Sequence, residues 1–357
     1  MRINYTMYGA GLTGGTRVVF EIANGLVERG HSVTITTLGN PSDANWFPLK
    51  AEANFLGQSV AARIVDRGLK KFPNIEIHPE TELCRLANAT PECDINVATF
   101  CLTAFPVFRS GKGIPFYHMQ HYEPLFFKTP YSARRAEETY YLPLHKIANS
   151  SWLRDRLEKD HNLLGIPLVF PAIDHSIFYP RARKAPSNNK RIISLVRDIT
   201  WKGFNDVISA LRIVSRDRSD VELVCFGASL PKGDYADLNI KLYSGMINES
   251  LAQLYAESDV LLSASWYESF PLPPLEAMAC ALPVVTTPYG TEDYCFDRDN
   301  CLIAPPREPE QMASAILEIL ESKGLAEKLR EKGLETAAKF TWQRTIDSVE
   351  TIFRQHA

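Results

Sequence analysis

The 357-residue chain lacks several features that would place a protein in a class at once. No apolar run approaches the roughly 20 residues that span a bilayer, and no charged-then-apolar signal segment opens the chain. An excess of one charge is also missing: 39 Lys+Arg stand against 42 Asp+Glu, so the net charge is −3 and the basic footprint of a nucleic-acid-binding protein is absent. We therefore expect a cytoplasmic protein without a nucleic-acid partner. Peripheral contact with the inner face of a membrane stays open.

Paired cysteine motifs are missing as well. The seven cysteines are an odd number without any C-x-x-C spacing, and several stand in apolar surroundings such as Val224-Cys225-Phe226. Small apolar side chains of this kind belong to a core in a reducing compartment. The sequence therefore gives no reason to expect a disulfide framework or a zinc site.

What is present is an alternation of strand-like and helix-like segments, with 45% hydrophobic residues to form a core. Such alternation is typical of parallel sheets with crossover helices. Strands are predicted at 2–7, 32–36, 95–99, 115–118, 146–148, 168–170, 191–196, 221–226, 240–243, 259–264 and 283–286. Helices are predicted at 16–29, 205–215, 249–258, 274–281, 308–321, 325–338 and 342–355, and 41–90 shows no clear order.

A polar, proline-containing run at 179–190 divides the pattern in two. The fold class is therefore α/β with two tandem doubly wound domains. We expect a first domain at 1–178, a linker at 179–190, a second domain at 191–340 and a final helical segment at 341–357.

The most informative segment is 266–281, which reads W-Y-E-S-F-P-L-P-P-L-E-A-M-A-C-A. Glu268 and Glu276 stand eight residues apart after an apolar strand, and the prolines place Pro274 near the first turn of a helix. A helix N-terminus offers unpaired N–H groups that attract phosphate and sugar oxygens, and carboxylates accept hydrogen bonds from hydroxyls. The segment predicts a sugar-nucleotide site.

This segment resembles the Glu-x₇-Glu signature of the retaining family-4 glycosyltransferases, which commonly reads E-G-F-G-L-P-x-L-E-A-M. Both glutamates, Phe270 and Leu272 are kept, whereas Pro271 replaces the usual glycine and removes one N–H donor. The resemblance covers nearly the whole chain. It implies the GT-B fold, in which an acceptor-side and a donor-side Rossmann-like domain face a central cleft and a C-terminal helix crosses back to the first domain.

A glycine loop follows the first predicted strand. Residues 9–14 read G-A-G-L-T-G, formally G-x-G-x-x-G, and Gly15 comes next. A dinucleotide-binding turn would also need an acidic residue after the second strand, where Thr36-Thr37-Leu38 stands. The resemblance implies instead that Gly14 and Gly15 face the diphosphate of the donor. A nicotinamide-dependent oxidoreductase remains the alternative.

Two cations follow the first strand of the second domain. Arg197 and Lys202 lie at the carboxyl edge of that sheet, where ligands of doubly wound folds bind. An arginine fork and a lysine ammonium both suit phosphate oxygens. The segment resembles the G-R-x-x-x-x-K-G run of the same family, with Val196 in place of glycine.

Two histidines end a first-domain strand in Phe116-Tyr117-His118-Met119-Gln120-His121. The resemblance implies a histidine near the transferred sugar, and His118 fits that place better than its competitor His121. Histidine can donate or accept a hydrogen bond at neutral pH. A buried structural histidine is the alternative.

Asp297-Arg298-Asp299 is a D-x-D sequence, the metal motif of the other main glycosyltransferase fold. It stands in a polar run just before an apolar strand and therefore predicts a turn. We expect no metal and no other cofactor.

The reaction implied by the resemblance moves a hexose or deoxyhexose from a nucleotide diphosphate sugar to a hydroxyl of a glycan, glycolipid or cell-envelope precursor, with retention at the anomeric carbon. Glu276 would bind ribose, and the segment Ser269, Phe270 and Leu272 would hold the sugar. Catalytic roles fall to Glu268 and to His118, with Arg197 and Lys202 stabilising the leaving diphosphate. A non-catalytic sugar- or nucleotide-binding protein is the other alternative.

Overall fold

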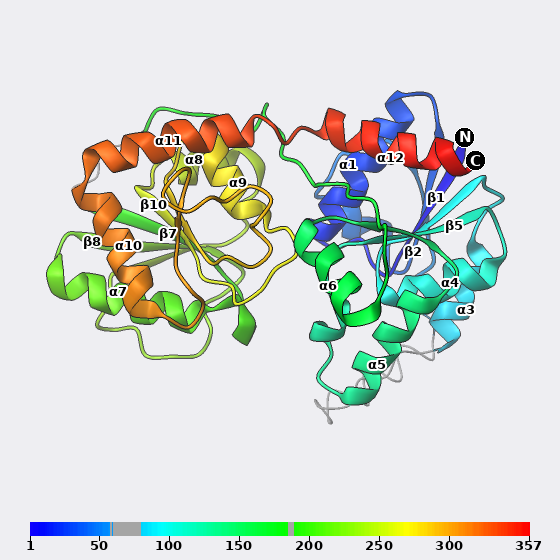
Figure 1. Cartoon of the computed structure of the whole chain (residues 1–357), viewed down its shortest axis with the longest axis horizontal. Coiled ribbons are helices and arrows are strands. Elements are labelled where there is room, and N and C mark those ends of the chain that lie inside the picture. The colour runs from blue at the N-terminus through cyan, green and yellow to red at the C-terminus, as the bar shows by residue number, and fades with distance from the viewer. Residues whose placement is uncertain (58, 60–79, 185–188) are drawn as a thin grey trace. The chain divides into compact units, whose positions relative to one another are not determined.

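We describe a computed structural model of the chain, which covers residues 1–57, 59, 80–184 and 189–357 (Figure 1). The chain divides into two compact units. Unit 1 comprises Met1–Pro171 and Trp342–Ala357, and unit 2 comprises Ala172–Thr341. Residues 185–188 of the expected linker lie outside the described part, so a linker at 179–190 stays a prediction.

In the described part of unit 1, six parallel strands form one sheet with the order β3-β2-β1-β4-β5-β6. The strands are β1 (Arg2–Met7), β2 (Ser32–Thr37), β3 (Glu52–Phe55), β4 (Ile95–Ala98), β5 (Ile114–Met119) and β6 (His145–Ala148). The helices are α1 (Gly14–Glu28), α3 (Glu80–Ala89), α4 (Cys101–Ser110), α5 (Pro130–Glu138), α6 (Ser151–His161) and α12 (Trp342–His356), with single turns η1 (Pro41–Ala44), η2 (Glu123–Phe126) and η3 (Thr139–Tyr141).

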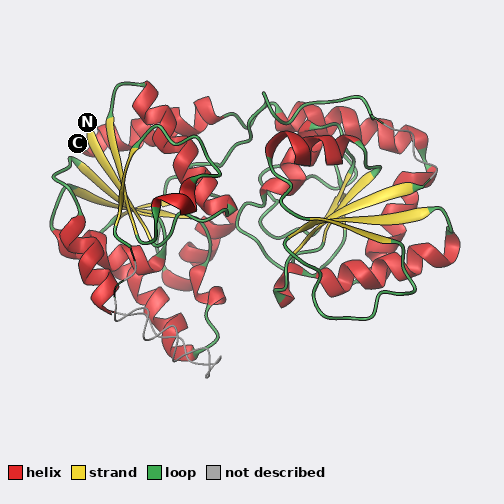
Figure 2. Cartoon of the chain, turned by 180° about the vertical axis from the view of Figure 1, so that it is seen from behind, coloured by secondary structure: helices red, strands yellow, loops and turns green. Residues whose placement is uncertain are grey.

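The described residues of unit 2 repeat the plan, with six parallel strands in the order β12-β11-β10-β7-β8-β9. The strands are β7 (Lys190–Val196), β8 (Val221–Gly227), β9 (Ile240–Tyr243), β10 (Val260–Ser263), β11 (Val284–Thr286) and β12 (Leu302–Ile303). The helices are α7 (Phe204–Asp217), α8 (Asn248–Ala256), α9 (Leu272–Ala279), α10 (Pro309–Glu321) and α11 (Lys323–Ala337), with the turn η4 (Thr200–Lys202). In each unit the helices cover both faces of the sheet (Figure 2).

Numbered within its own unit, each sheet has the strand order 3-2-1-4-5-6 of the Rossmann fold. The order reverses between β1 and β4 in unit 1 and between β7 and β10 in unit 2, where the first and fourth strands pair in parallel. Doubly wound proteins bind ligands outside the carboxyl ends of the strands at this reversal. The topology therefore marks one candidate binding edge in each unit.

The C-terminal helix α12 belongs to the core of unit 1. It lies beside α1 (Figure 1), and Gly25 permits the approach because a Cβ there would stand 2.0 Å from Ile346 Cδ1. Phe353 packs edge-on against Phe116 of β5, with ring centroids 4.9 Å apart. The structure confirms the prediction that the last helix, α12, packs against the first Rossmann-like unit.

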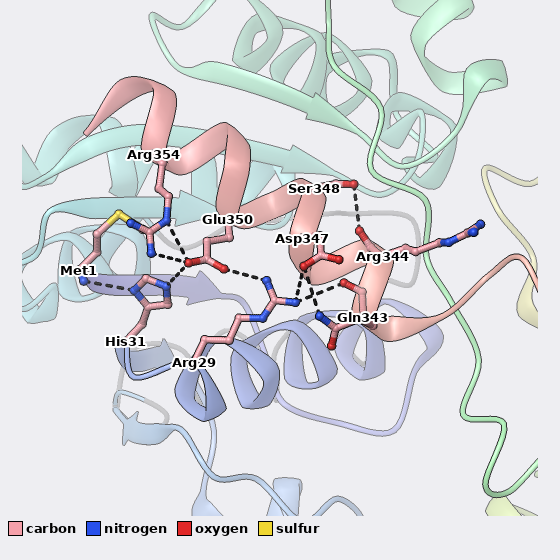
Figure 3. A network of polar contacts seen from close by, with 9 residues as sticks. All are labelled: Met1, Arg29, His31, Gln343, Arg344, Asp347, Ser348, Glu350 and Arg354. Carbon is pink, nitrogen blue, oxygen red and sulfur yellow. Dashed lines mark hydrogen bonds and ion pairs between the residues drawn. The ribbon is translucent and has the colours of Figure 1, made fainter.

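A polar network fastens the same helix (Figure 3). Arg29 contacts Asp347 at 2.6 Å and Glu350 at 2.7 Å, while His31 Nε2 lies 3.0 Å and Arg354 2.6 Å from Glu350. Hydrogen bonds from Arg29 and Arg354 lower the pKa of Glu350 from 4.5 to about 2. Glu350 is thus a carboxylate that the fold stabilises in its charged form.

One predicted element is absent and another is shifted. The strand expected at 168–170 is wrong: only a single bridge joins Leu168 to Ala148, because Pro167 and Pro171 on either side have no N–H to extend the ladder. The helix expected at 274–281 is present and runs two residues earlier, from Leu272 to Ala279. Within the described residues, no helix is both long and apolar enough to cross a bilayer.

Candidate active site

The candidate site of unit 2 lies at the reversal of strand order. The segment after β7 carries Arg197 and Lys202, and the loop between β10 and α9 carries Glu268. The two segments touch at Gly203, where a Cβ would stand 2.0 Å from the carbonyl oxygen of Ala264 and where φ is +71°. Glycine is therefore required at the point where the two segments meet.

Lys202 and Glu268 form an ion pair at this edge, with Nζ and Oε1 2.5 Å apart. Their side chains are only 18% and 13% exposed, so solvent screens the pair weakly. Arg197 directly follows β7 and is exposed. Sequence reasoning expected these three residues at one edge and missed that Lys202 pairs with Glu268.

Aromatic contacts hold the two segments together. The backbone N–H of Trp266 donates to the Trp201 carbonyl oxygen at 2.8 Å, and the Trp266 ring N–H donates to Asp206 Oδ2 at 2.6 Å. The rings of Trp201 and Tyr267 stack with centroids 5.0 Å apart. The position of Lys202 relative to Glu268 is thus set by packing on both sides of it.

The N-terminus of α9 has fewer free backbone N–H donors than the sequence suggests. The first four N–H positions of a helix are its unpaired donors, but here they fall on Pro271, Leu272, Pro273 and Pro274, and only Leu272 has an N–H. Pro271 is the N-cap with φ −69°, an angle that proline favours. The helix end therefore has one backbone N–H donor among these four positions, Leu272.

The loop before α9 is well packed. Ser269 and Phe270 are buried, and the Phe270 ring lies 5.0 Å from Tyr294 and 5.6 Å from Phe340. The hydroxyl of Tyr294 donates to the carbonyl oxygen of Pro271 at 2.5 Å. The backbone of Ser269, Phe270 and Leu272 is consequently held in one position rather than free to adjust.

Glu276 lies on α9, 8% exposed, and its Oε2 accepts a hydrogen bond from the Tyr255 hydroxyl at 3.2 Å. Tyr255 is completely buried on α8. Sequence reasoning did not find Tyr255. The available signal was a tyrosine on the apolar face of a helix, because a buried tyrosine hydroxyl needs a hydrogen-bond partner.

In unit 1 the glycine loop follows β1. Thr13 Oγ1 caps α1 by accepting from the Thr16 N–H at 3.1 Å, so Gly14 and Gly15 form the first turn of that helix. A Cβ on Gly15 would stand 3.1 Å from Gln120 Oε1 at the end of β5. A Cβ on Gly15 would therefore fit tightly against the Gln120 side chain, whereas nothing within 4 Å would crowd a Cβ on Gly9 or Gly11.

The two histidines differ in depth. His118 lies inside β5, 1% exposed, and its Nε2 has no hydrogen-bond partner among the described residues. Burial lowers the pKa of His118 to about 4, so the ring is neutral at pH 7. His121 lies beyond the strand end, 7% exposed, with its ring 4.5 Å from Phe126.

Glu123, close to both histidines in sequence, is a core residue. Its carboxyl group accepts from the Tyr117 hydroxyl at 2.6 Å and from the backbone N–H of Cys101 at the start of α4. Burial raises the pKa of Glu123 to about 8. A buried and largely protonated carboxyl of this kind caps a helix and gives no sign of contact with a ligand.

The D-x-D sequence forms a turn before β12, as expected. Asp297 Oδ1 accepts from the Ile303 N–H at 2.8 Å, and Arg298, with φ +59°, pairs with Glu318 at 2.9 Å. Among the described residues, no three His, Cys, Asp or Glu side chains are grouped to hold a metal ion.

Comparison with known proteins places the chain in a class. Over 99% of this chain, the fold matches that of Anabaena Alr3699/HepE, solved with UDP and glucose (TM-score 0.79, 15% identity, 100% of that chain). It also matches sucrose-phosphate synthase from Thermosynechococcus elongatus (TM-score 0.78, 19% identity, 98% of that chain). The fold is the GT-B fold of glycosyltransferases.

Sequence comparison relates part of the chain to a family. Residues 190–322, which hold Arg197, Lys202 and both glutamates, match the model of glycosyl transferases group 1. The chain is 28% identical over 264 residues to the O-antigen biosynthesis protein RfbC of Myxococcus xanthus, which covers 72% of this chain and 20% of that protein. It is 26% identical over 226 residues to the MMP α-(1→4)-mannosyltransferase of Mycolicibacterium hassiacum, 60% of this chain and 53% of that protein.

Residues 190–322 thus match the group 1 glycosyltransferases, and this match confirms the resemblance inferred from the Glu-x₇-Glu loop. The chain spans about half the length of one of these two relatives and a fifth of the other.

Proposed function

We propose that the chain is a retaining glycosyltransferase that moves a hexosyl group from a nucleotide diphosphate sugar to a hydroxyl of a glycan or glycolipid. The observation that carries the proposal is the pairing of Lys202 with Glu268 at the strand-order reversal of unit 2. The segment that contains this pair is the one that matches the family.

The diphosphate would lie against Arg197 and Lys202. An ammonium group has three N–H donors, so Lys202 can keep its bond to Glu268 and still donate to a phosphate oxygen. As the bond between sugar and phosphate breaks, negative charge grows on the leaving diphosphate, and two nearby cations stabilise it. This is the charge that a divalent metal supplies in other enzymes, so we propose a metal-independent reaction.

The two glutamates would have different roles. Glu276 lies on α9 and accepts a hydrogen bond from the hydroxyl of Tyr255 on α8. Its carboxylate is a suitable acceptor for ribose hydroxyls. Glu268 stands in the loop beside the proposed phosphate position and carries the negative charge that favours a cationic sugar. Ser269, Phe270 and Leu272 would hold the sugar through their backbone. Gly14, Gly15 and His118 belong to unit 1, and the donor contacts expected of them stay predictions.

Nucleotide binding is the first test, because a ligand of the native state raises Tm. Thermal unfolding is measured with UDP, GDP, ADP, dTDP and NAD, beginning with UDP, the nucleotide named for Alr3699/HepE. One nucleoside diphosphate should raise Tm and NAD should not. Stabilisation by NAD alone would favour an oxidoreductase instead.

The second test is the reaction. The nucleotide sugar that matches the stabilising nucleotide is incubated with the protein, and the anomer of the released or transferred sugar is read by NMR before it equilibrates. Retention of the donor's anomeric configuration is expected. Tight nucleotide binding without hydrolysis or transfer to any acceptor offered would favour the non-catalytic binding protein.

A further inference from the structure

A row of aromatic rings follows the carboxyl edge of the sheet in unit 1. We call it the aromatic strip: Tyr8, Phe100, Phe126, His121 and Trp152. Successive ring centroids are 6.5 Å (Tyr8–Phe100), 6.3 Å (Phe100–Phe126), 4.5 Å (Phe126–His121) and 5.8 Å (His121–Trp152) apart. The rings form one connected row.

The order of the rings follows the order of the strands. Tyr8 comes directly after β1, Phe100 after β4, His121 and Phe126 after β5, and Trp152 in the first turn of α6 after β6. These four strands are neighbours in the sheet in this order. The strip thus begins at the reversal between β1 and β4, where the topology places a ligand, and runs outward from it along the edge.

The strip is partly open to solvent, although His121 is only 7% exposed and Tyr8 and Phe100 pack on one side against buried residues of α3 and α4. Phe126 is 40% exposed, and Tyr8, Phe100 and Trp152 are half-buried. Large side chains left partly exposed at a binding edge are characteristic of a site for a ligand with an apolar face.

The chemistry of the strip suits a pyranose ring. One face of a sugar presents C–H groups with partial positive charge, which pack against the negative face of an aromatic ring. The hydroxyl groups at the rim of the sugar need polar partners. The half-buried Gln120 at the end of β5 has an amide that both donates and accepts, and it lies at the same edge against Gly15.

We propose that the aromatic strip binds a saccharide ring of the acceptor, so that the acceptor is a glycan and is recognised through its sugar. This inference rests on the proposed transferase function. A lipid tail is the competing ligand, because a cavity of about 330 Å³ between α3, α4 and α5, lined by Leu83, Leu102 and Phe127, offers an apolar surface nearby.

Binding is tested without catalysis, by saturation-transfer NMR of the full chain with methyl α-D-mannopyranoside, methyl α-D-glucopyranoside and octyl α-D-glucopyranoside. Saturation should reach the ring C–H protons of the sugars. Phe126→Leu keeps an apolar side chain but removes the π face, and should weaken the contact about 3- to 10-fold. Phe126→Tyr should retain it.

Phe108→Leu is the matched control, since Phe108 on α4 is 46% exposed and lies outside the strip. Saturation of only the octyl tail, no saturation of any sugar by the wild type, or equal signals from Phe126→Leu and the wild type would each overturn the proposal. Nucleotide binding is measured on the same samples. If the sugars do not bind the aromatic strip but the nucleotide still binds, this inference is rejected and the proposed function is unaffected.

Discussion

Lys202 Nζ lies 2.5 Å from Glu268 Oε1, and the two residues lie in the segments that follow β7 and β10, the strands between which the order of the unit 2 sheet reverses. One of the proposed diphosphate cations is thus already neutralised by a carboxylate when no ligand is bound. A phosphate must share Lys202 with Glu268 rather than find an unpaired ammonium. In the proposed mechanism, Lys202 would therefore couple the charge of Glu268 to the charge of the leaving diphosphate.

The first prediction concerns the two cations. Arg197→Ala and Lys202→Ala should each reduce kcat/KM by about 2–4 kcal/mol of transition-state stabilisation, because in the proposed mechanism each removes charge that stabilises the departing diphosphate. Steady-state kinetics with the donor measure the effect. Arg216→Ala, on the exposed side of α7, should stay near wild type. Normal rates in both site variants would remove Arg197 and Lys202 from the proposed site.

The pair itself gives a second prediction. Because Lys202→Ala leaves Glu268 without its partner, the effects of Lys202→Ala and Glu268→Gln should not add in the double variant. A double-mutant cycle on kcat/KM measures the interaction, which lies at about 0.5–3 kcal/mol for contacting residues. Arg197→Ala combined with Glu268→Gln serves as the comparison. Strict additivity of Lys202→Ala and Glu268→Gln would mean that their contact has no part in the reaction.

The two glutamates should separate in kinetics. In the proposed mechanism Glu276 contacts ribose before and during the reaction, so Glu276→Ala should raise the Kd of the nucleotide and KM more than it lowers kcat. Glu268→Gln keeps the shape and removes the charge, so it should lower kcat more than it changes nucleotide affinity. Isothermal titration and steady-state kinetics give both quantities. Equal, small effects of the two substitutions would contradict the assignment.

Tyr255 is predicted to act through Glu276. Tyr255→Phe removes only the hydroxyl that donates to Glu276, which should weaken nucleotide binding by roughly 0.5–1.5 kcal/mol and leave kcat nearly unchanged. Tyr235→Phe removes a hydroxyl that donates to the Pro231 carbonyl oxygen in the same unit, and is the matched control. A loss of stability without a change in nucleotide affinity would make Tyr255 a packing residue only.

Much of the fold could be predicted from the sequence, because alternating β-branched and amphipathic runs are typical of a parallel sheet with crossover helices. The candidate site residues could be placed near the sheet edge because they follow predicted strands. Local patterns did not reveal contacts between segments that are distant in sequence. The pairing of Lys202 with Glu268 and of Tyr255 with Glu276 joins separate loops and helices. The aromatic strip was missed for the same reason, since its rings come from four different strand ends.

Removal of metal should not abolish the activity. Arg197 and Lys202 supply the positive charge in the proposed mechanism, and the D-x-D aspartates lie in a turn where Asp297 binds the Ile303 N–H. Transfer measured in EDTA should therefore continue at a rate close to that in buffer. Loss of activity in EDTA that Mg²⁺ or Mn²⁺ restores would instead assign the charge stabilisation to a metal.

The last prediction concerns the attachment of α12 to unit 1 (Figure 3). The fold lowers the pKa of Glu350 from 4.5 to about 2, so its ion pairs add stability above about pH 4.5 and lose it as the pH falls toward 2. Glu350→Gln should destabilise the protein at pH 7 by roughly 1–3 kcal/mol. Calorimetric unfolding of both proteins between pH 7 and pH 3 should show the difference shrinking, because Glu350 takes up a proton in the unfolded wild type near pH 4.5 while it stays charged in the folded protein. Glu335→Gln, in the exposed pair with Lys332, should have little effect at any pH. A difference that stays constant across this range would show that the side chain at 350 stabilises α12 through packing and not through its charge.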